Sequence, residues 1–284
     1  MKKIKTIQKT IIALLLMVMV GSLLTGCAST TTGDVDSDST QNTAVETKTD
    51  EIKKAGKLVL GTSADYPPYE FHKVINGKPE IVGFDIEIAK EIAKDLGVEL
   101  EIKDMKFEGL LAALEAGNVD FVIAGMSATE ERKKSVDFSK TYYQAEQTLL
   151  VRAEDQDKIQ TIEDLAGLTI GAQKTTLQEE IALTKIPGAE AKLLGKITDL
   201  VLELKNNKID GIVLSSSVAK AYEKNSSDLF VPSISFGAEE GVAVAIKKNN
   251  EDLVEAINQT LDRLIAEDKI NQLIHEATIL SEEE

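Results

Sequence analysis

Residues 119 to 132 read VDFVIAGMSATEER and combine side chains that could bind a carboxylate. An apolar strand breaks at Gly125, and Ser127 stands three residues before Glu130, which is the spacing of a capping box. This spacing predicts a helix that begins at Ser127 with unpaired backbone N–H groups suited to an anion. Arg132, in its first turn, could hold a carboxylate through two parallel hydrogen bonds. An ordinary capped helix with a surface arginine would show the same pattern.

The N-terminus has the pattern of a bacterial secretory signal. Lysines at positions 2, 3, 5 and 9 precede an apolar run that is too short to span a membrane as a helix and ends in Leu24-Thr25-Gly26-Cys27. Leu-x-Gly-Cys resembles a lipobox, so residues 1–26 are predicted to be a signal peptide and Cys27 to be lipidated. Cys27 is the only cysteine in the chain, which excludes an internal disulfide. Two acyl chains would anchor the protein stably to the outer face of the cell membrane.

The composition separates a linker from a folded part. Residues 27–50 are rich in Ser, Thr and Asp and are predicted to form a disordered, lipid-anchored tether. The whole chain carries a net charge of −16, and without the four signal-peptide lysines it carries −20. Such an acidic surface argues against nucleic acid as a partner. The two histidines lie far apart and no metal-ligand cluster is visible, so neither a metal nor a cofactor is expected.

Helix and strand patterns alternate along the folded part. Residues 58–63 predict a buried strand, 83–97 a helix ended by Gly97, and 253–274 one amphipathic helix. Two segments, 110–127 and 200–217, share leucines, a turn, an aspartate, a strand and a final serine. This repeat predicts an α/β fold of two lobes, each a mixed, mainly parallel sheet flanked by helices, with a ligand cleft between the lobes.

The same patterns predict where the chain passes between the lobes. Lobe 1 is expected to comprise residues 51–145 and 237–284, and lobe 2, with hinge strands, residues 146–236. The crossings are placed at 146–151 and 231–236, and paired crossings would permit hinge closure around a ligand.

Several long motifs, in a fixed order, carry a family resemblance. They are GTSADYPPYEF (61–71), GFDIEIAKEIAKDLG (83–97), FEGLLAALEAGNVD (107–120), AGMSATEERKKSVDFSKTYY (124–143), TIEDLAGLTIGAQKTTLQE (161–179) and VAVAIKK (242–248). With them, residues 57–277 resemble the extracytoplasmic amino-acid-binding proteins of bacterial ABC importers, which have the type II periplasmic-binding fold. The resemblance implies a receptor that delivers an amino acid to separate permease and ATPase subunits. We expect such a receptor to be a monomer without enzymatic activity.

Two other functions remain open at this point. A sensory lipoprotein would need the same cleft. A few relatives of these binding proteins catalyse dehydration with a cleft carboxylate, but the sequence shows no set of nucleophile, base and orienting residue.

The resemblance also implies a ligand site. Tyr66 and Phe107 match aromatic walls, and Gly125, Ser127 and Arg132 match the carboxylate grip. A capping-box spacing from Thr176 to Glu179 matches the loop that closes over the carboxylate. The other implied site residues are Ser63, Met126, Gln173, Thr175 and Ser215.

Three positions depart from the family pattern. Thr175 stands where glycine is usual, so a loop of different shape is expected. Ser63 stands where relatives that bind cationic side chains carry an acid, which favours a neutral polar ligand. Ser215 replaces the acid that pairs with the ligand ammonium, and a buried ammonium without an anion is costly. Either Glu146, Glu239 or Glu240 takes over that role, or the ligand is not an ordinary α-amino acid.

Overall fold

The computed structural model describes residues 46–238 and 240–282. The helices are α2 (Lys48–Ala55), α3 (Phe84–Leu96), α4 (Leu110–Glu115), α5 (Leu177–Thr184), α6 (Ile197–Lys205), α7 (Ser216–Lys224), α8 (Glu251–Ala266) and α9 (Lys269–Glu282), with 3-10 turns η1 (Phe107–Gly109), η2 (Arg132–Lys134), η3 (Ala153–Asp155) and η4 (Glu163–Leu165). The strands are β1 (Lys57–Thr62), β2 (Asp65–Tyr66), β3 (Glu70–Ile75), β4 (Lys78–Val82), β5 (Glu99–Asp104), β6 (Phe121–Val122), β7 (Val136–Tyr143), β8 (Glu146–Arg152), β9 (Thr169–Gln173), β10 (Glu190–Leu194), β11 (Gly211–Ser215), β12 (Leu229–Phe230), β13 (Ser235–Ala238) and β14 (Val242–Lys247).

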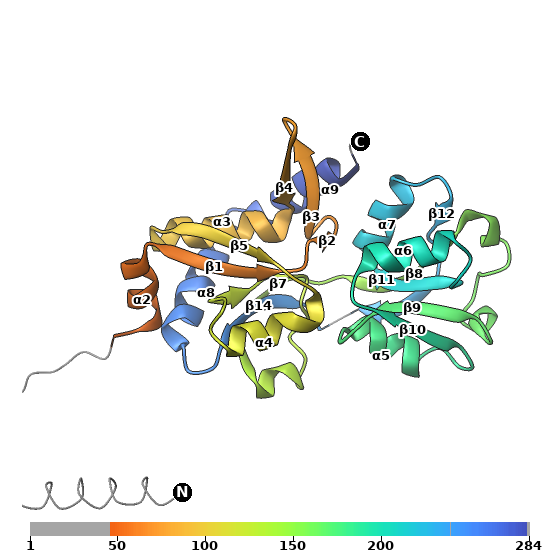
Figure 1. Cartoon of the computed structure of the whole chain (residues 1–284), viewed down its shortest axis with the longest axis horizontal. Coiled ribbons are helices and arrows are strands. Elements are labelled where there is room, and N and C mark those ends of the chain that lie inside the picture. Colours follow the sequence, from red (N-terminus) through yellow and green to blue (C-terminus); the bar gives the residue numbers. More distant parts are fainter. Residues whose placement is uncertain (1–45, 239, 283–284) are drawn as a thin grey trace, which may run out of the picture. The chain divides into compact units, whose positions relative to one another are not determined.

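The first sheet has the strand order β5-β1-β6-β14-β7 and is covered on both faces (Figure 1). Leu58 and Leu60 of β1 pack into the core that contains α3, α8 and α9. Val59 points the other way and packs with Leu110 of α4, as the two-residue alternation of a strand requires. Because both faces are covered, β1 is an almost continuous apolar run.

The second sheet has the order β10-β9-β11-β8-β12, and β13 also pairs with β8. Its two faces alternate in the same way. Leu150 and Ile212 belong to the core shared with α6 and α7, whereas Leu149 and Val213 face the core of α5. This helix-covered mixed sheet matches the fold class predicted from the sequence.

The internal repeat corresponds to equivalent structural units. Asp120 Oδ2 accepts a hydrogen bond from Val59 N at 2.8 Å, which fixes the start of β6 to β1. Asp210 Oδ2 accepts one from Thr169 N at 2.9 Å, which fixes β11 to β9 in the same way. Both pairs of strands run parallel, so the two aspartates have the same structural role in the two sheets.

Three details differ from the expectations. The first sheet has two parallel and two antiparallel strand pairs, and the second sheet has two parallel and three antiparallel pairs. The chain enters β14 of the first sheet from the second lobe and β8 of the second sheet from the first lobe, and each of these strands is antiparallel to its neighbours. The helix expected over 253–274 is two helices, separated at Asp268 with a φ of 54°. The chain leaves β7 of the first sheet at Tyr143 and enters β8 of the second sheet at Glu146, and it leaves β13 of the second sheet at Ala238 and enters β14 of the first sheet at Val242. We therefore propose a second lobe that ends after β13, slightly later than residue 236.

A separate three-stranded sheet, β2-β3-β4, adjoins the first lobe. None of the helices between residues 46 and 282 is long and apolar enough to cross a membrane. The predicted signal peptide, Cys27 and most of the tether lie outside the described residues.

Candidate ligand-binding site

A small cavity and a wider groove lie next to each other between residues of the two sheets. The inner cavity has a volume of about 20 Å³ and the outer groove about 740 Å³. Among the predicted site residues, those that line the inner cavity are Ser63, Tyr66, Phe107, Gly125, Ser127, Arg132, Gln173 and Thr176. Met126 and Thr175 line the outer groove. The inner cavity holds little more than a water molecule, so an amino acid can enter only if its walls move apart.

The segment around Ser127 does not begin a helix, so that prediction is wrong. Ser127 forms a β-bridge with Val242, and Ala243 N donates to Met126 O at 3.0 Å. This pairing with β14 keeps the backbone extended where a helix was expected. Only the 3-10 turn η2 follows, beginning at Arg132. Gly125 adopts a φ of 53°, and a side chain there would meet the Tyr66 ring at 3.2 Å.

The Arg132 guanidinium lies between the two lobes, as a carboxylate grip would require. Its Nη1 donates to Ser127 O at 2.7 Å, and its Nη2 donates to Thr175 O, in the second lobe, at 2.9 Å. The guanidinium carbon stands 5.3 Å from the centre of the Phe107 ring, within the range of a cation–π contact. Arg132 is therefore oriented by three different segments at the edge of the inner cavity.

The second predicted cap is present at α5. Thr176 is its N-cap, and its side chain accepts a hydrogen bond from Glu179 N at 3.2 Å. The Glu179 carboxylate accepts a hydrogen bond from Thr175 N, whereas in a standard capping box it would accept one from the N–H of the N-cap residue, Thr176. Thr175 has a φ of 62°, so this threonine adopts the left-handed conformation that glycine favours. The expected change of backbone shape at this position is therefore not seen.

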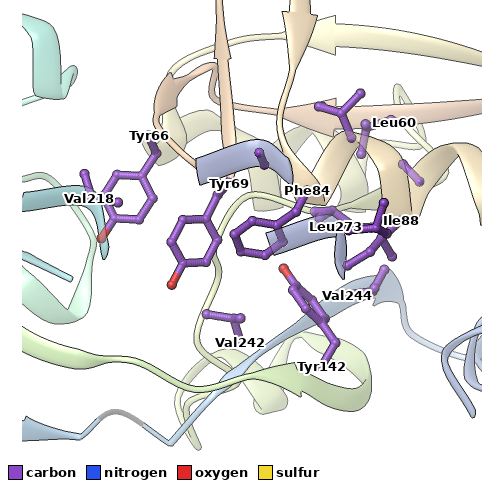
Figure 2. Close-up of a cluster of buried hydrophobic side chains, with 14 of the residues drawn as sticks. Leu60, Tyr66, Tyr69, Phe84, Ile88, Tyr142, Val218, Val242, Val244 and Leu273 are labelled. Carbon is purple, nitrogen blue, oxygen red and sulfur yellow. The ribbon is translucent and has the colours of Figure 1, made fainter. Parts of the chain in front are cut away.

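A row of aromatic rings supports the cavity from the first lobe (Figure 2). The Tyr66 and Tyr69 ring centres are 5.3 Å apart, and those of Tyr69 and Phe84 are 4.5 Å apart. The Tyr66 hydroxyl reaches the second lobe, where it accepts hydrogen bonds from Ser215 N at 3.2 Å and Gln178 Nε2 at 3.1 Å. Tyr66 is thus both a wall of the cavity and a bridge between the lobes.

Two acids that were not predicted as site residues also line the inner cavity. Asp65 and Glu70 are 5% and 1% exposed. Glu70 Oε2 has no hydrogen-bond partner among the described residues. Burial, together with the nearby Asp85 carboxylate, raises the pKa of Glu70 well above its usual range. Both acids lie inside the motif 61–71, so their proximity to Tyr66 in sequence was an available signal. Gln178 of α5 was missed as well.

Asp85 connects Glu70 to the predicted carboxylate grip. Its Oδ2 accepts hydrogen bonds from Gly125 N at 2.8 Å and from the Tyr142 hydroxyl at 3.0 Å. Burial raises the pKa of Asp85 to about 6, while these two donors act in the opposite direction. The backbone of the glycine segment is therefore held by a fully buried carboxyl group.

None of the described glutamates predicted to pair with the ligand ammonium lines the inner cavity. Ser215 is buried at the end of β11, and its backbone N–H donates to the Tyr66 hydroxyl. Its side chain is a hydroxyl and provides no negative charge at that position. Glu146 lines neither cavity, and its Oε2 lies 3.5 Å from Ser235 Oγ. Glu240 is exposed in the outer groove, and Glu239 lies outside the described residues. No cluster of metal-binding side chains occurs within residues 46–238 and 240–282.

Comparison with known proteins decides the family. Residues 58–277 match the model of bacterial extracellular solute-binding proteins, family 3. The chain belongs to this family. As a family 3 solute-binding protein it acts outside the cytoplasm, and it shares 41% identity over 212 residues with the arginine-binding extracellular protein ArtP of Bacillus subtilis, covering 73% of this chain and 80% of ArtP.

Solved structures of similar proteins agree with the two-lobed fold. The amino acid ABC transporter substrate-binding protein AbpA of Streptococcus pneumoniae, bound to L-arginine, is 38% identical, with a TM-score of 0.79 over 82% of this solute-binding protein and 99% of AbpA. The ancestral amino-acid-binding protein AncCDT-1, a precursor of cyclohexadienyl dehydratase, is 34% identical, with a TM-score of 0.75 over 81% and 99% of the two chains. ArtP and AbpA are both named as binding proteins.

Proposed function

We propose that this solute-binding protein captures a cationic amino acid, with arginine as the first candidate, and delivers it to an ABC importer. The charges of the inner cavity carry this proposal. Arg132 provides one cation, and Asp65 and Glu70 provide two carboxyl groups. Arginine carries the complementary set of one carboxylate and two cations. Burial raises the pKa of both acids, and two cationic groups of a ligand would favour their ionised forms, whereas a neutral amino acid would offer only one.

The binding mode follows from the positions of these groups. The ligand carboxylate is expected at Arg132, near the N-terminus of α5, where N–H groups favour an anion. The cationic groups are expected toward Asp65 and Glu70. This assignment replaces the neutral polar ligand suggested by Ser63, because acids two and seven residues further along supply the negative charge that Ser63 lacks. It also supplies an anion for the ammonium in the absence of an acid at residue 215.

A thermal-shift screen of the protein amino acids, followed by calorimetry of the hits, tests the proposal. A ligand at 100 times its Kd stabilises the bound protein by about 2.7 kcal/mol. For a protein of this size, that corresponds to a rise in Tm of roughly 5–10 °C. We expect arginine to give such a shift and glutamine to give little. Tighter binding of a neutral amino acid would contradict the cationic class, and no shift with any amino acid would contradict the function.

The proposal also covers delivery to an ABC importer, anchoring to the membrane and binding without turnover. The family and the relatives named for ABC transport support a role in an ABC importer. We propose that the permease and ATPase are separate subunits and that this protein acts as a monomer. We propose anchoring through a lipid on Cys27, so Cys27→Ala should release the protein from the membrane fraction. Loss of arginine uptake on gene deletion would favour import over a sensory role. Recovery of unchanged arginine after long incubation would support binding without turnover.

A further inference from the structure

Asp65 connects the lobes through the start of a helix in the second lobe. Its Oδ2 accepts a hydrogen bond from Ile197 N, at the first residue of α6, at 2.7 Å. Within the described part of the chain, the N-cap residue Lys196 makes no capping hydrogen bond with its own side chain. The Tyr222 hydroxyl of α7 also donates to the backbone oxygen of Asp65, at 3.0 Å. The first lobe therefore supplies a cap for a helix of the second lobe.

The contact between the lobes also buries this carboxylate. Asp65 is 5% exposed, and besides Ile197 N the described residues offer its side chain the Ser63 hydroxyl at 3.3 Å. Separation of the lobes would break the contacts with α6 and α7 and return the carboxylate to water. A carboxylate loses much hydration on burial, and one good N–H donor with one weak hydroxyl compensates only in part.

The charged and titratable neighbours of Asp65 are of both signs. Lys196 at the start of α6 favours the ionised form, whereas Asp104 of the first lobe opposes it. Glu70 faces the same inner cavity, and His72 lines the groove on the other side of Asp65. Burial is the largest cause of the shift and raises the pKa of Asp65 to about 6.

We propose that Asp65 makes closure of the lobes depend on a positive charge in the ligand. The inference rests on the proposed capture of a cationic amino acid and assigns its selectivity to one residue. With a cation in the inner cavity, the buried carboxylate has a counter-charge and stays ionised. With a neutral ligand of the same shape, closure must either bury an uncompensated charge or take up a proton. Asp65 thus selects against neutral isosteres at the closing step.

Citrulline is the matched probe, because its neutral urea group replaces the guanidinium of arginine with little change in shape. In the wild-type protein, citrulline should bind more weakly than arginine at pH 7.5, and binding should take up a proton in mild acid. A carboxyl pKa of about 6 when Asp65 is buried, against its ordinary value of 3.8 in water, gives citrulline about a tenfold gain in affinity from pH 7.5 to pH 5. Arginine should show a much smaller gain.

The variant Asp65→Asn keeps the size of the side chain and an oxygen for Ile197 N. Calorimetry should show that it loses the tenfold gain for citrulline and that its arginine-to-citrulline affinity ratio at pH 7.5 falls at least tenfold. Asp164→Asn is the matched control, since Asp164 also accepts backbone N–H bonds but is exposed and lines neither cavity. His72→Gln controls for the neighbouring imidazole. Both controls should behave as wild type.

The outcomes separate the two proposals. If the wild-type protein does not bind arginine, the proposed function fails, whatever Asp65 does. If arginine binds but Asp65→Asn keeps both the affinity ratio and the pH dependence, the selectivity role of Asp65 is overturned and the function stands. Circular dichroism establishes that the variant is folded. If it is not, Asp65→Ser provides the same comparison, and a wild-type citrulline affinity that does not rise toward pH 5 overturns the inference by itself.

Discussion

Arg132 offers the sharpest test of the carboxylate grip. Lysine at this position keeps the positive charge but cannot reproduce two parallel hydrogen bonds, and methionine removes the charge with a similar length of side chain. A charge-assisted hydrogen bond contributes about 1.5–3 kcal/mol. We therefore expect Arg132→Lys, which retains one such bond, to weaken arginine binding roughly 10- to 100-fold, and Arg132→Met to weaken it more than 100-fold.

The structure also predicts how these variants affect the protein without ligand. Arg132 bonds to carbonyl oxygens of Ser127 and Thr175 and is only partly buried, so the loss in stability should be small beside the loss in affinity. Calorimetric titration with arginine gives the affinity, and urea unfolding of the free protein gives the stability. An Arg132→Met variant that binds arginine within threefold of wild type would refute the carboxylate grip.

Three further variants test the local physical chemistry. Thr175→Gly should raise the free energy of unfolding by about 0.5–1 kcal/mol. Glycine removes the strain of a β-branched residue at a φ of 62°, and this gain exceeds the extra entropy of glycine in the unfolded chain. A lower Tm would contradict this expectation. Gly125→Ala should cost about 1–2 kcal/mol and weaken binding, since the new methyl meets Tyr66, and unchanged urea unfolding would exclude the clash. The pKa of Asp85 is raised to about 6 in the folded protein, so its contribution to stability is full below the unfolded pKa of 3.8 and is lost as the pH rises to 6. Asp85→Asn should therefore gain up to about 3 kcal/mol relative to wild type between pH 4 and pH 7 in urea unfolding, and a difference independent of pH would contradict that account.

Much of the fold could be predicted from the sequence because local patterns and packing agree. The helix expected over 83–97 is α3, and Gly97 ends it in the left-handed conformation. The repeated aspartates, Asp120 and Asp210, make the same contact in the two sheets. Such features depend on short-range periodicity and on turns, which sequence expresses directly.

Two predicted helices were wrong because a distant contact or a single backbone angle overrides the local helical pattern. Ser127 has a good capping pattern, but pairing with Val242, more than a hundred residues later, keeps its segment extended. A single helix over 253–274 has a continuous apolar pattern, and only the left-handed residue Asp268 separates α8 from α9. Neither the pairing nor this backbone angle has a local signature that outweighs the helical pattern.

The candidate site could be predicted in part. The resemblance placed Tyr66, Arg132 and Thr176 together, and the structure brings all three to one cavity. It did not indicate which of the residues beside Tyr66 face the cavity, because β2 and β3 belong to a small separate sheet with no clear alternation of burial. Asp65 and Glu70 were therefore missed, and with them the negative charge that changes the expected ligand.

A crystal structure of the protein with L-arginine would test the central proposal most directly. We predict that the ligand lies between Tyr66 and Phe107 with its carboxylate against the Arg132 guanidinium. Its guanidinium or ammonium group should lie within hydrogen-bond distance of Asp65 or Glu70. An arginine bound with its carboxylate directed away from Arg132, or bound outside the cavity between the lobes, would contradict the account.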